Sequence, residues 1–171
     1  MERILRPVVV GPRPRPKAAL FSRASDAWTT PPDLFAALDA EFAFDLDAAA
    51  TAETALCSRY FGPDHPDPYY RNSLVIEWAA ATFVNPPYSQ VGAFIAKAAA
   101  DAGTGCTVVA LVPARTDTRW WHAHVWDGAQ HRPRPGVELR FLKGRLKFSD
   151  ARNSAPFPSV VVVWRPGAGP R

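Results

Sequence analysis

Apolar positions along the chain follow two spacings, one typical of helices and one typical of buried strands. Leu34, Phe35 and Leu38 have helical spacing and predict a helix over about residues 31–41. Continuous apolar runs at residues 106–112 and 159–164 instead predict strands that are buried on both faces. Strand and helix patterns alternate along the chain, which favours an α/β fold.

Turn and capping residues mark the limits of the predicted elements. Thr30 is a candidate N-cap with Pro31 at the first helical position, and Ser89 can cap a helix that runs to Ala102 with Gly103 beyond its end. We expect a mostly parallel sheet with antiparallel edge strands. The other predicted elements are a strand over residues 42–47, a short helix over 52–60, a strand over 81–84, a helix from Thr116 or Asp117 to Trp126, and a hairpin of residues 137–142 and 145–148 that turns at Lys143 and Gly144.

The length of 171 residues suits a single domain. No apolar stretch approaches the roughly 20 residues of a transmembrane helix, and no apolar segment follows the positive N-terminus, so we expect neither a membrane span nor a signal peptide. Two cysteines, Cys57 and Cys106, do not make a disulfide scaffold or a zinc site. A reducing, cytoplasmic setting is the resulting expectation.

Charge is distributed unevenly along the chain. Residues 1–25 carry a net charge of +5, residues 26–111 carry −8, and residues 112–171 carry +7. The alternation of proline with basic residues predicts a flexible basic arm over 1–25, followed by a folded domain over 26–165 and a loose tail over 166–171. A basic face is the electrostatic footprint of a polyanion partner, although it is equally compatible with a solvated surface.

The sharpest chemical signal is the tetrapeptide Asn85-Pro86-Pro87-Tyr88, which directly follows the predicted strand over 81–84. Ligands of open α/β sheets bind beyond the carboxyl ends of strands. The prolines offer carbonyl acceptors and no donors, Asn85 adds a side-chain acceptor, and Tyr88 adds a flat ring. This set suits an exocyclic amino group on an aromatic base, and the alternative is an ordinary turn.

Several charged residues are further candidates for binding. Asp45 and Asp47 end a predicted strand near the same crevice, although alternating acids also mark solvent-exposed edges. Arg115 and Thr116 follow the strand over 106–112, where an arginine can contact a phosphate or a base edge. A metal site at His122 and His124 would need more ligands than the sequence offers nearby, so no metal is expected. Four basic residues flank the predicted hairpin turn and can grip phosphates or remain solvated: Arg140, Lys143, Arg145 and Lys147.

The chain resembles the phage-type DNA N6-adenine methyltransferase (Dam) family over about residues 27–164. Asn-Pro-Pro-Tyr resembles the catalytic motif of amino-group methyltransferases, and the other motifs of this family follow in the right order. These are Trp28-Thr29-Thr30-Pro31-Pro32-Asp33-Leu34-Phe35, Phe44-Asp45-Leu46-Asp47-Ala48-Ala49-Ala50, the run from Val84 to Ser89, Pro113-Ala114-Arg115-Thr116-Asp117-Thr118 with Trp120-Trp121-His122, Gly144-Arg145-Leu146-Lys147-Phe148, and Ala155-Pro156-Phe157-Pro158-Ser159.

The resemblance implies an abbreviated class I, Rossmann-like methyltransferase sheet in a bacterial or phage-infected cytoplasm. It implies methyl transfer from S-adenosylmethionine to the N6 amino group of adenine in double-stranded DNA. By the same resemblance, Asn85, Pro86, Pro87 and Tyr88 carry catalysis. The cofactor residues are then Thr30, Pro31, Asp45, Asp47 and Ala48, and the DNA contacts are Arg115, Thr116, Arg140, Lys143, Arg145 and Lys147.

Three departures from the family pattern concern the cofactor side. The glycine-rich methyltransferase loop is absent, Ala48 replaces a proline, and only 37 residues separate Asp47 from Asn85. A methyltransferase that acts on RNA or on a protein glutamine is one alternative. A binding module that has lost catalysis is another, and a metal-dependent nuclease that uses His122, His124 and an aspartate is a third.

Overall fold

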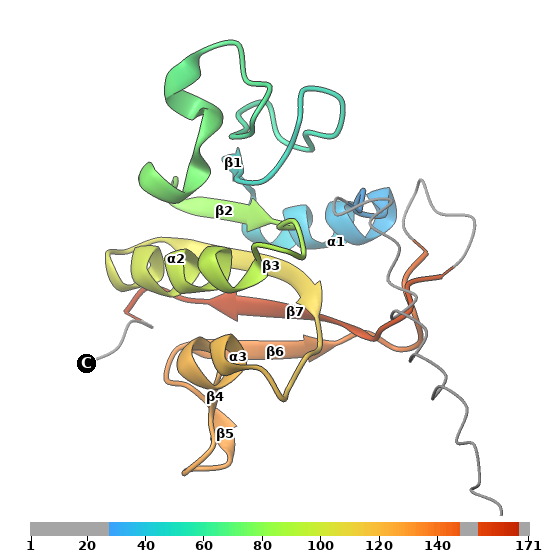
Figure 1. Ribbon diagram of the computed structural model, residues 1–171, viewed down its shortest axis with the longest axis vertical. Helices are drawn as coiled ribbons and strands as arrows, with labels where there is room; N and C mark the ends of the chain where they lie inside the picture. Colours follow the sequence, from blue (N-terminus) through green and yellow to red (C-terminus); the bar gives the residue numbers. More distant parts are fainter. Residues whose placement is uncertain (1–27, 148–153, 168–171) are drawn as a thin grey trace, which may run out of the picture.

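Five strands of the computed structural model form one sheet in the order β1-β2-β3-β7-β6 (Figure 1). The structure describes residues 28–147 and 154–167, so the expected arm over 1–25 and most of the expected tail lie outside it. The strands of this sheet are β1 (Leu46–Asp47), β2 (Ala81–Val84), β3 (Thr107–Pro113), β6 (Val137–Phe141) and β7 (Ser159–Trp164).

Strand β7 alone runs opposite to the other four strands of the sheet, and it lies inside the sheet between β3 and β6. The expectation of antiparallel edge strands was therefore wrong in position, because the edge strands β1 and β6 point the same way as β2 and β3. All six residues of β7 are buried, so both of its faces need covering layers. The carboxyl ends of β1, β2, β3 and β6 consequently share one edge of the sheet (Figure 1).

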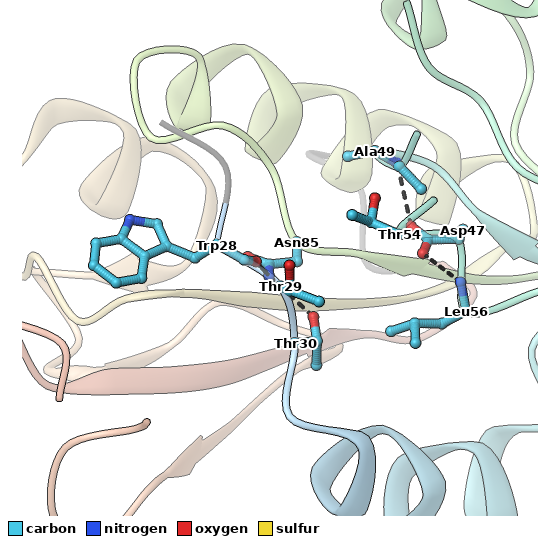
Figure 2. A pocket seen from close by; sticks show the side chains of 9 residues that line it. Trp28, Thr29, Thr30, Asp47, Ala49, Thr54, Leu56 and Asn85 are labelled. Carbon is cyan, nitrogen blue, oxygen red and sulfur yellow. Dashed lines mark hydrogen bonds between the residues drawn. The ribbon is translucent and has the colours of Figure 1, made fainter. Parts of the chain in front are cut away.

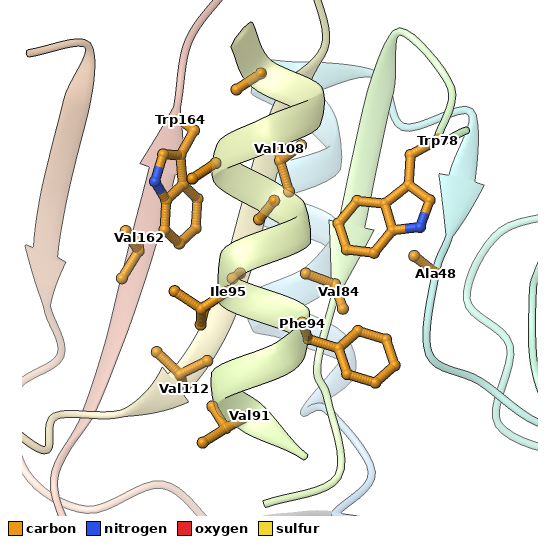
Figure 3. Packing of buried hydrophobic residues seen from close by; sticks show 14 of the residues in the cluster. Ala48, Trp78, Val84, Val91, Phe94, Ile95, Val108, Val112, Val162 and Trp164 are labelled. Carbon is orange, nitrogen blue, oxygen red and sulfur yellow. The ribbon is translucent and has the colours of Figure 1, made fainter. Parts of the chain in front are cut away.

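Helices cover both faces of the sheet, as expected for an α/β fold. Alternate strand residues point to opposite faces, so Val108 and Val162 pack on the side covered by α2 (Val91–Gly103) (Figure 3). Helix α3 (Arg119–His124) joins the same cluster through Trp121. Val109 and Val161 pack with α1 (Pro32–Phe42) on the other face. Trp121 is buried in the first of these layers. Within the described ranges, no helix is both long and apolar enough to cross a bilayer.

Helix α1 begins one residue later than expected. Pro31 is the N-cap with an extended backbone (φ −58°, ψ 129°), and no side chain caps the helix. The residue before a proline is driven away from helical geometry, so Pro32 excludes Pro31 from the helix. Thr30 is therefore not the N-cap, and its hydroxyl is available for a different partner. Helix α2 matches the predicted helix closely but begins after Gln90 rather than at Ser89.

Two predicted elements in the first half of the chain are shorter or absent. The strand expected over 42–47 is reduced to β1, because Phe42 still belongs to α1 and Ala43 adopts a left-handed conformation (φ 49°) that ends the helix. The helix expected over 52–60 is replaced by turns. Two short 3-10 helices follow instead, over Pro68–Arg71 and Ser73–Val75.

The predicted carboxyl-terminal hairpin is also only half correct. Strand β6 forms as expected, but it pairs with β7 and not with residues 145–147. Leu146 accepts a hydrogen bond from the Ala155 N–H at 2.8 Å, so this segment leaves the sheet. A small hairpin that the sequence pattern did not indicate joins α3 to β6, and its strands are β4 (Trp126–Asp127) and β5 (Arg132–Pro133).

Candidate functional site

A pocket lies at the carboxyl ends of the neighbouring parallel strands β1 and β2 (Figure 2). Asp47 is the last residue of β1, and Asn85 directly follows β2. Residues that precede α1 form a further wall, so the pocket brings together segments that are far apart in the sequence. Its lining residues are Trp28, Thr29, Thr30, Asp47, Ala49, Ala50, Thr54, Leu56 and Asn85.

The Asn85 side chain is held in one orientation by two hydrogen bonds. Its Nδ2 atom donates to the backbone carbonyl of Trp28 at 2.6 Å and to the Thr30 hydroxyl at 3.0 Å. A carbonyl oxygen can only accept, so the amide nitrogen must face Trp28. Both amide hydrogens are used in this way, and Oδ1 is the remaining polar atom. The half-buried Asn85 therefore presents an acceptor, as the sequence predicted.

Asp47 is a nearly fully buried carboxyl group in the wall of the same pocket. Its Oδ1 accepts from the Ala49 N–H at 3.3 Å and its Oδ2 accepts from the Leu56 N–H at 3.2 Å (Figure 2). Burial raises the pKa of Asp47 to about 6, and the two N–H donors oppose this rise only in part. A cationic ligand group in the pocket would stabilise the charged form.

Tyr88 belongs to a cluster of three rings beyond the end of β2. Its ring lies nearly parallel to Trp28, with centroids 6.4 Å apart, and edge-on to Phe157 at 5.0 Å. Burial raises the pKa of the half-buried Tyr88, so its hydroxyl stays protonated at neutral pH. Pro86 is buried, and the Pro87 carbonyl accepts from the Gln90 N–H at the turn into α2.

Three residues expected on the cofactor side do not line the described pocket. Asp45 is exposed and lies before β1, where its Oδ2 accepts from the Ala81 N–H at the amino end of β2. Asp45 is therefore at the opposite end of the strand pair from Asn85, and we remove it from the candidate site. Ala48 is fully buried and donates its N–H to the Phe83 carbonyl, while Pro31 caps α1.

The predicted basic residues fall into two groups. Arg115 and Thr116 follow β3 and are exposed. The positive charge of Arg115 lowers the pKa of Tyr88, against the larger rise caused by burial. The basic residues beyond β6, Lys143, Arg145 and Lys147, are also exposed. Since β3 and β6 are parallel, both segments follow strand ends at the edge that carries the pocket.

Arg140 differs from the other basic residues because carboxylates already surround it. Its guanidinium pairs with both oxygens of Glu41 at 2.5 and 2.6 Å and with Glu138 at 2.6 Å. It also lies over the Phe42 ring, 5.3 Å from the centroid. Arg140 thus joins the end of α1 to β6, and we remove it from the expected DNA contacts.

The residues between β1 and β2 form a pocket wall that the sequence analysis missed. Thr54 and Leu56 fall in the segment expected to be helical, yet both line the pocket. Residues 59–62 run beside β1, since the Asp47 N–H donates to Arg59 and the Ala50 N–H donates to Phe61. The only sequence signal for this arrangement is Gly62, whose backbone lies against Ala50.

Substituting Gly62 with alanine tests whether this wall is built as described. A Cβ atom at residue 62 would stand 1.6 Å from the Ala50 carbonyl oxygen, so the backbone must move. We expect a loss of about 1–3 kcal/mol in the free energy of unfolding, measured by urea denaturation. The matched control is Gly128→Ala, where an added Cβ makes only an ordinary contact, 3.7 Å from the His122 Nδ1 atom, and should cost much less stability. A Gly62→Ala protein with wild-type stability would contradict this packing.

The described residues contain no cluster of three or more side chains that could hold a metal ion. His122 and His124 lie in α3, and the carbonyls of both residues accept hydrogen bonds, from Arg134 and Trp164 respectively. These contacts tie α3 to β7 and to Arg134, the residue that directly follows β5. The backbone carbonyls of the two histidines therefore help to hold α3 in place against its neighbours.

Together, the sheet and its pocket define a mixed α/β protein of methyltransferase-like fold, with an amide acceptor and a buried carboxyl at one strand edge. A sequence profile of the DNA N-6-adenine-methyltransferase (Dam) family matches residues 17–171, and the chain belongs to this family. The chain is also 31% identical over 99 residues to the DNA N-6-adenine-methyltransferase of Escherichia phage T1. That match covers 56% of this chain and 39% of the phage protein. The resemblance seen in the sequence motifs is thereby confirmed.

Proposed function

We propose that the chain transfers a methyl group to the N6 amino group of adenine in DNA. Family membership supports this reaction, and the observation that carries it is the fixed amide of Asn85. An exocyclic amino group needs acceptors and no competing donors. Asn85 offers only Oδ1, and it does so at the rim of a pocket with a buried carboxyl.

The mechanism rests on two acceptors and the geometry they impose. The Asn85 Oδ1 and the Pro86 carbonyl accept the two N6 hydrogens, while the Pro87 carbonyl is occupied by Gln90. Adenine N6 is a poor nucleophile, because its lone pair is delocalised into the ring. The two acceptors favour a pyramidal nitrogen and stabilise the positive charge that develops as its lone pair attacks the methyl carbon. The attack is in line, and one N6 proton then leaves to solvent.

The polar groups that line the pocket fit S-adenosylmethionine. When bound, this cofactor supplies a methyl group whose bond to sulfur breaks with the electron pair staying on sulfur. Asp47 would take a positively charged or hydroxyl group of the ligand, since its buried carboxyl has only backbone N–H partners in the structure described. Thr30 adds a hydroxyl to the opposite wall. The sheet, with one reversed inner strand, fits an abbreviated class I methyltransferase arrangement.

Duplex DNA is the substrate that this site fits best. A paired adenine cannot reach Asn85, so the base must leave the stack. Tyr88 offers a ring held by Trp28 and Phe157, on which such a base can stack. The exposed basic segments beyond β3 and β6 lie at the same sheet edge and would hold the phosphates on either side.

The direct test compares substrates under identical conditions. The protein is incubated with isotope-labelled S-adenosylmethionine and with DNA, RNA or a protein release factor that carries a glutamine acceptor. We expect label only in DNA, on adenine N6, as read by mass spectrometry of the nucleosides. Label in RNA or on glutamine would contradict the proposal and identify a methyltransferase of that other substrate. Cofactor binding without methyl transfer would identify a binding module. Cleavage of DNA that depends on a divalent ion would favour the nuclease alternative.

Variants of Tyr88 separate stacking from hydroxyl chemistry. Stacking on an aromatic side chain is worth roughly 1–3 kcal/mol per base, so Tyr88→Ala should lose about one to two decades in activity on duplex DNA. Tyr88→Phe keeps the ring and should stay mostly active. Methyl transfer and melting temperature are measured for both variants. Equal inactivity of the two would show that the hydroxyl matters, and unfolding of Tyr88→Ala would make the ring a core element.

The placement of the basic residues leads to a prediction on salt dependence. Lys143 and Lys147 are exposed, so replacing both with alanine should reduce the slope of log binding constant against log salt concentration by about 1–2. Arg140→Ala is the matched control, because this side chain is held by Glu41 and Glu138. Its substitution should leave the slope unchanged and lower the melting temperature. A smaller salt slope in Arg140→Ala, with an unchanged melting temperature, would show that Arg140 contacts DNA.

A further inference from the structure

The hydrogen bonds of Asn85 come from a segment that no catalytic motif includes. The Trp28 carbonyl and the Thr30 hydroxyl lie 57 and 55 residues before Asn85, yet each accepts one hydrogen of the same amide group. Thr30 is only 3% exposed, and its hydroxyl also lines the pocket (Figure 2). A buried hydroxyl that contacts the catalytic amide from outside its loop is placed to control that amide.

We propose that Thr30 is a positioning residue for the Asn85 amide, acting together with the Trp28 carbonyl. The inference rests on the proposed function and names what holds its central acceptor in place. Two bonds to one nitrogen fix the rotation of the amide group, which a single bond leaves adjustable. Oδ1 is thereby directed at one point before a substrate arrives, and no reorganisation is needed during the reaction.

The same pair of contacts explains why residue 85 is an asparagine. An aspartate here would bring a carboxylate oxygen to 2.6 Å from the Trp28 carbonyl oxygen, with no hydrogen between them. Repulsion would rotate the carboxylate away from the Trp28 carbonyl and displace the acceptor. The Trp28 carbonyl therefore selects an amide over an acid, and the Thr30 hydroxyl fixes how that amide is turned.

The test uses two substitutions of Thr30 and one matched control in the same pocket. Thr30→Val keeps the shape of the side chain and removes its hydroxyl. We expect its rate at saturating cofactor and DNA to fall at least about tenfold, because a misdirected acceptor slows the chemical step. Thr30→Ser restores the hydroxyl and should recover most of that rate. Thr54→Val removes a pocket hydroxyl that bonds Thr51 rather than Asn85, and it should weaken cofactor binding more than it lowers the saturated rate.

A measurement that needs no catalysis completes the test. The side-chain amide signal of Asn85 in a nitrogen–proton NMR spectrum is identified by its disappearance in Asn85→Ala. Both amide hydrogens should exchange slowly with solvent in the wild type, and one should exchange rapidly in Thr30→Val. Unchanged exchange in Thr30→Val, or a saturated rate equal to that of the wild type, would overturn the positioning role. Slow exchange in a protein that methylates no adenine would instead overturn the proposed function and leave the positioning of the amide supported.

Discussion

Replacing Asn85 with alanine is expected to slow adenine methylation by about 10²- to 10³-fold, the cost typical of losing one preorganised group that stabilises a transition state. The substitution removes an acceptor for an N6 hydrogen, together with the hydrogen bonds to the Trp28 carbonyl and the Thr30 hydroxyl. Asn85 follows β2 and is only half-buried, so the core between the helices and the sheet stays intact. Single-turnover methyl transfer on duplex DNA measures the effect.

The control for Asn85→Ala is cofactor affinity, which should change by less than the rate. Calorimetric titration with S-adenosylmethionine reports it without DNA. Asn85→Asp is the second comparison, and we expect it to be nearly as slow as Asn85→Ala, since the Trp28 carbonyl faces the substituted atom. Methylation by Asn85→Ala at a rate close to that of the wild type would show that catalysis lies elsewhere.

Cofactor affinity is expected to depend on pH through Asp47. Its pKa is raised to about 6 by burial, so a ligand cation must displace a proton when it binds below that pH. Cofactor affinity should fall by up to about tenfold for each pH unit below 6. Calorimetry in two buffers of different ionisation enthalpy should detect proton release near pH 5.5, about where the carboxyl is partly protonated.

Asp47→Asn removes the charge with little change in shape. We expect its cofactor affinity at neutral pH to be weaker by about 10- to 100-fold, the value of a charge-assisted hydrogen bond. Its affinity should vary much less between about pH 5 and pH 7, because the amide, unlike the wild-type carboxyl, does not change charge in this range. A wild-type affinity that is constant across this range would show that the ligand cation does not contact Asp47.

The same carboxyl should affect folding stability in the opposite direction: acid weakens cofactor binding but favours the folded state. Because the folded pKa of about 6 lies above the usual 3.8, the folded state holds the proton more tightly than the unfolded chain. The contribution of Asp47 therefore favours folding below about pH 4 and is lost as the pH rises through 6. A bound cation at Asp47 would reverse this loss.

Local sequence signals identified the elements that form the central layers. The apolar runs behind β3 and β7 are long enough to require burial on both faces, and both strands formed within one residue of expectation. Helices α1 and α2 follow their apolar spacing in the same way. The motif at Asn85 was placed correctly at a strand end because the sequence shows a short apolar run directly before it.

Long-range contacts decided the features that the sequence did not reveal. Arg140 looks like a free base in a basic segment, but its partner Glu41 lies 99 residues away. Thr30 has the sequence context of a cap, yet its hydroxyl bonds Asn85. The turns at Thr54 and Leu56 depend on the Asp47 carboxyl and on the segment beside β1, so helical propensity over 52–60 was overruled by tertiary structure.

The two N–H groups that bond the Asp47 carboxyl give the pocket wall a stability of its own. Ala49 and Leu56 are anchored to a side chain of a two-residue strand, whereas the amides of β3 and β7 are locked in the middle of the sheet. Local opening of the wall therefore costs less than global unfolding. Deuterium uptake at these two amides will be faster than in β3. Their protection factors, which correct for the intrinsic pH dependence of amide exchange, will rise when acid neutralises the carboxyl, because the closed wall holds the proton more tightly than the open one. The exchange of these two amides, measured residue by residue, thus reports the charge on Asp47.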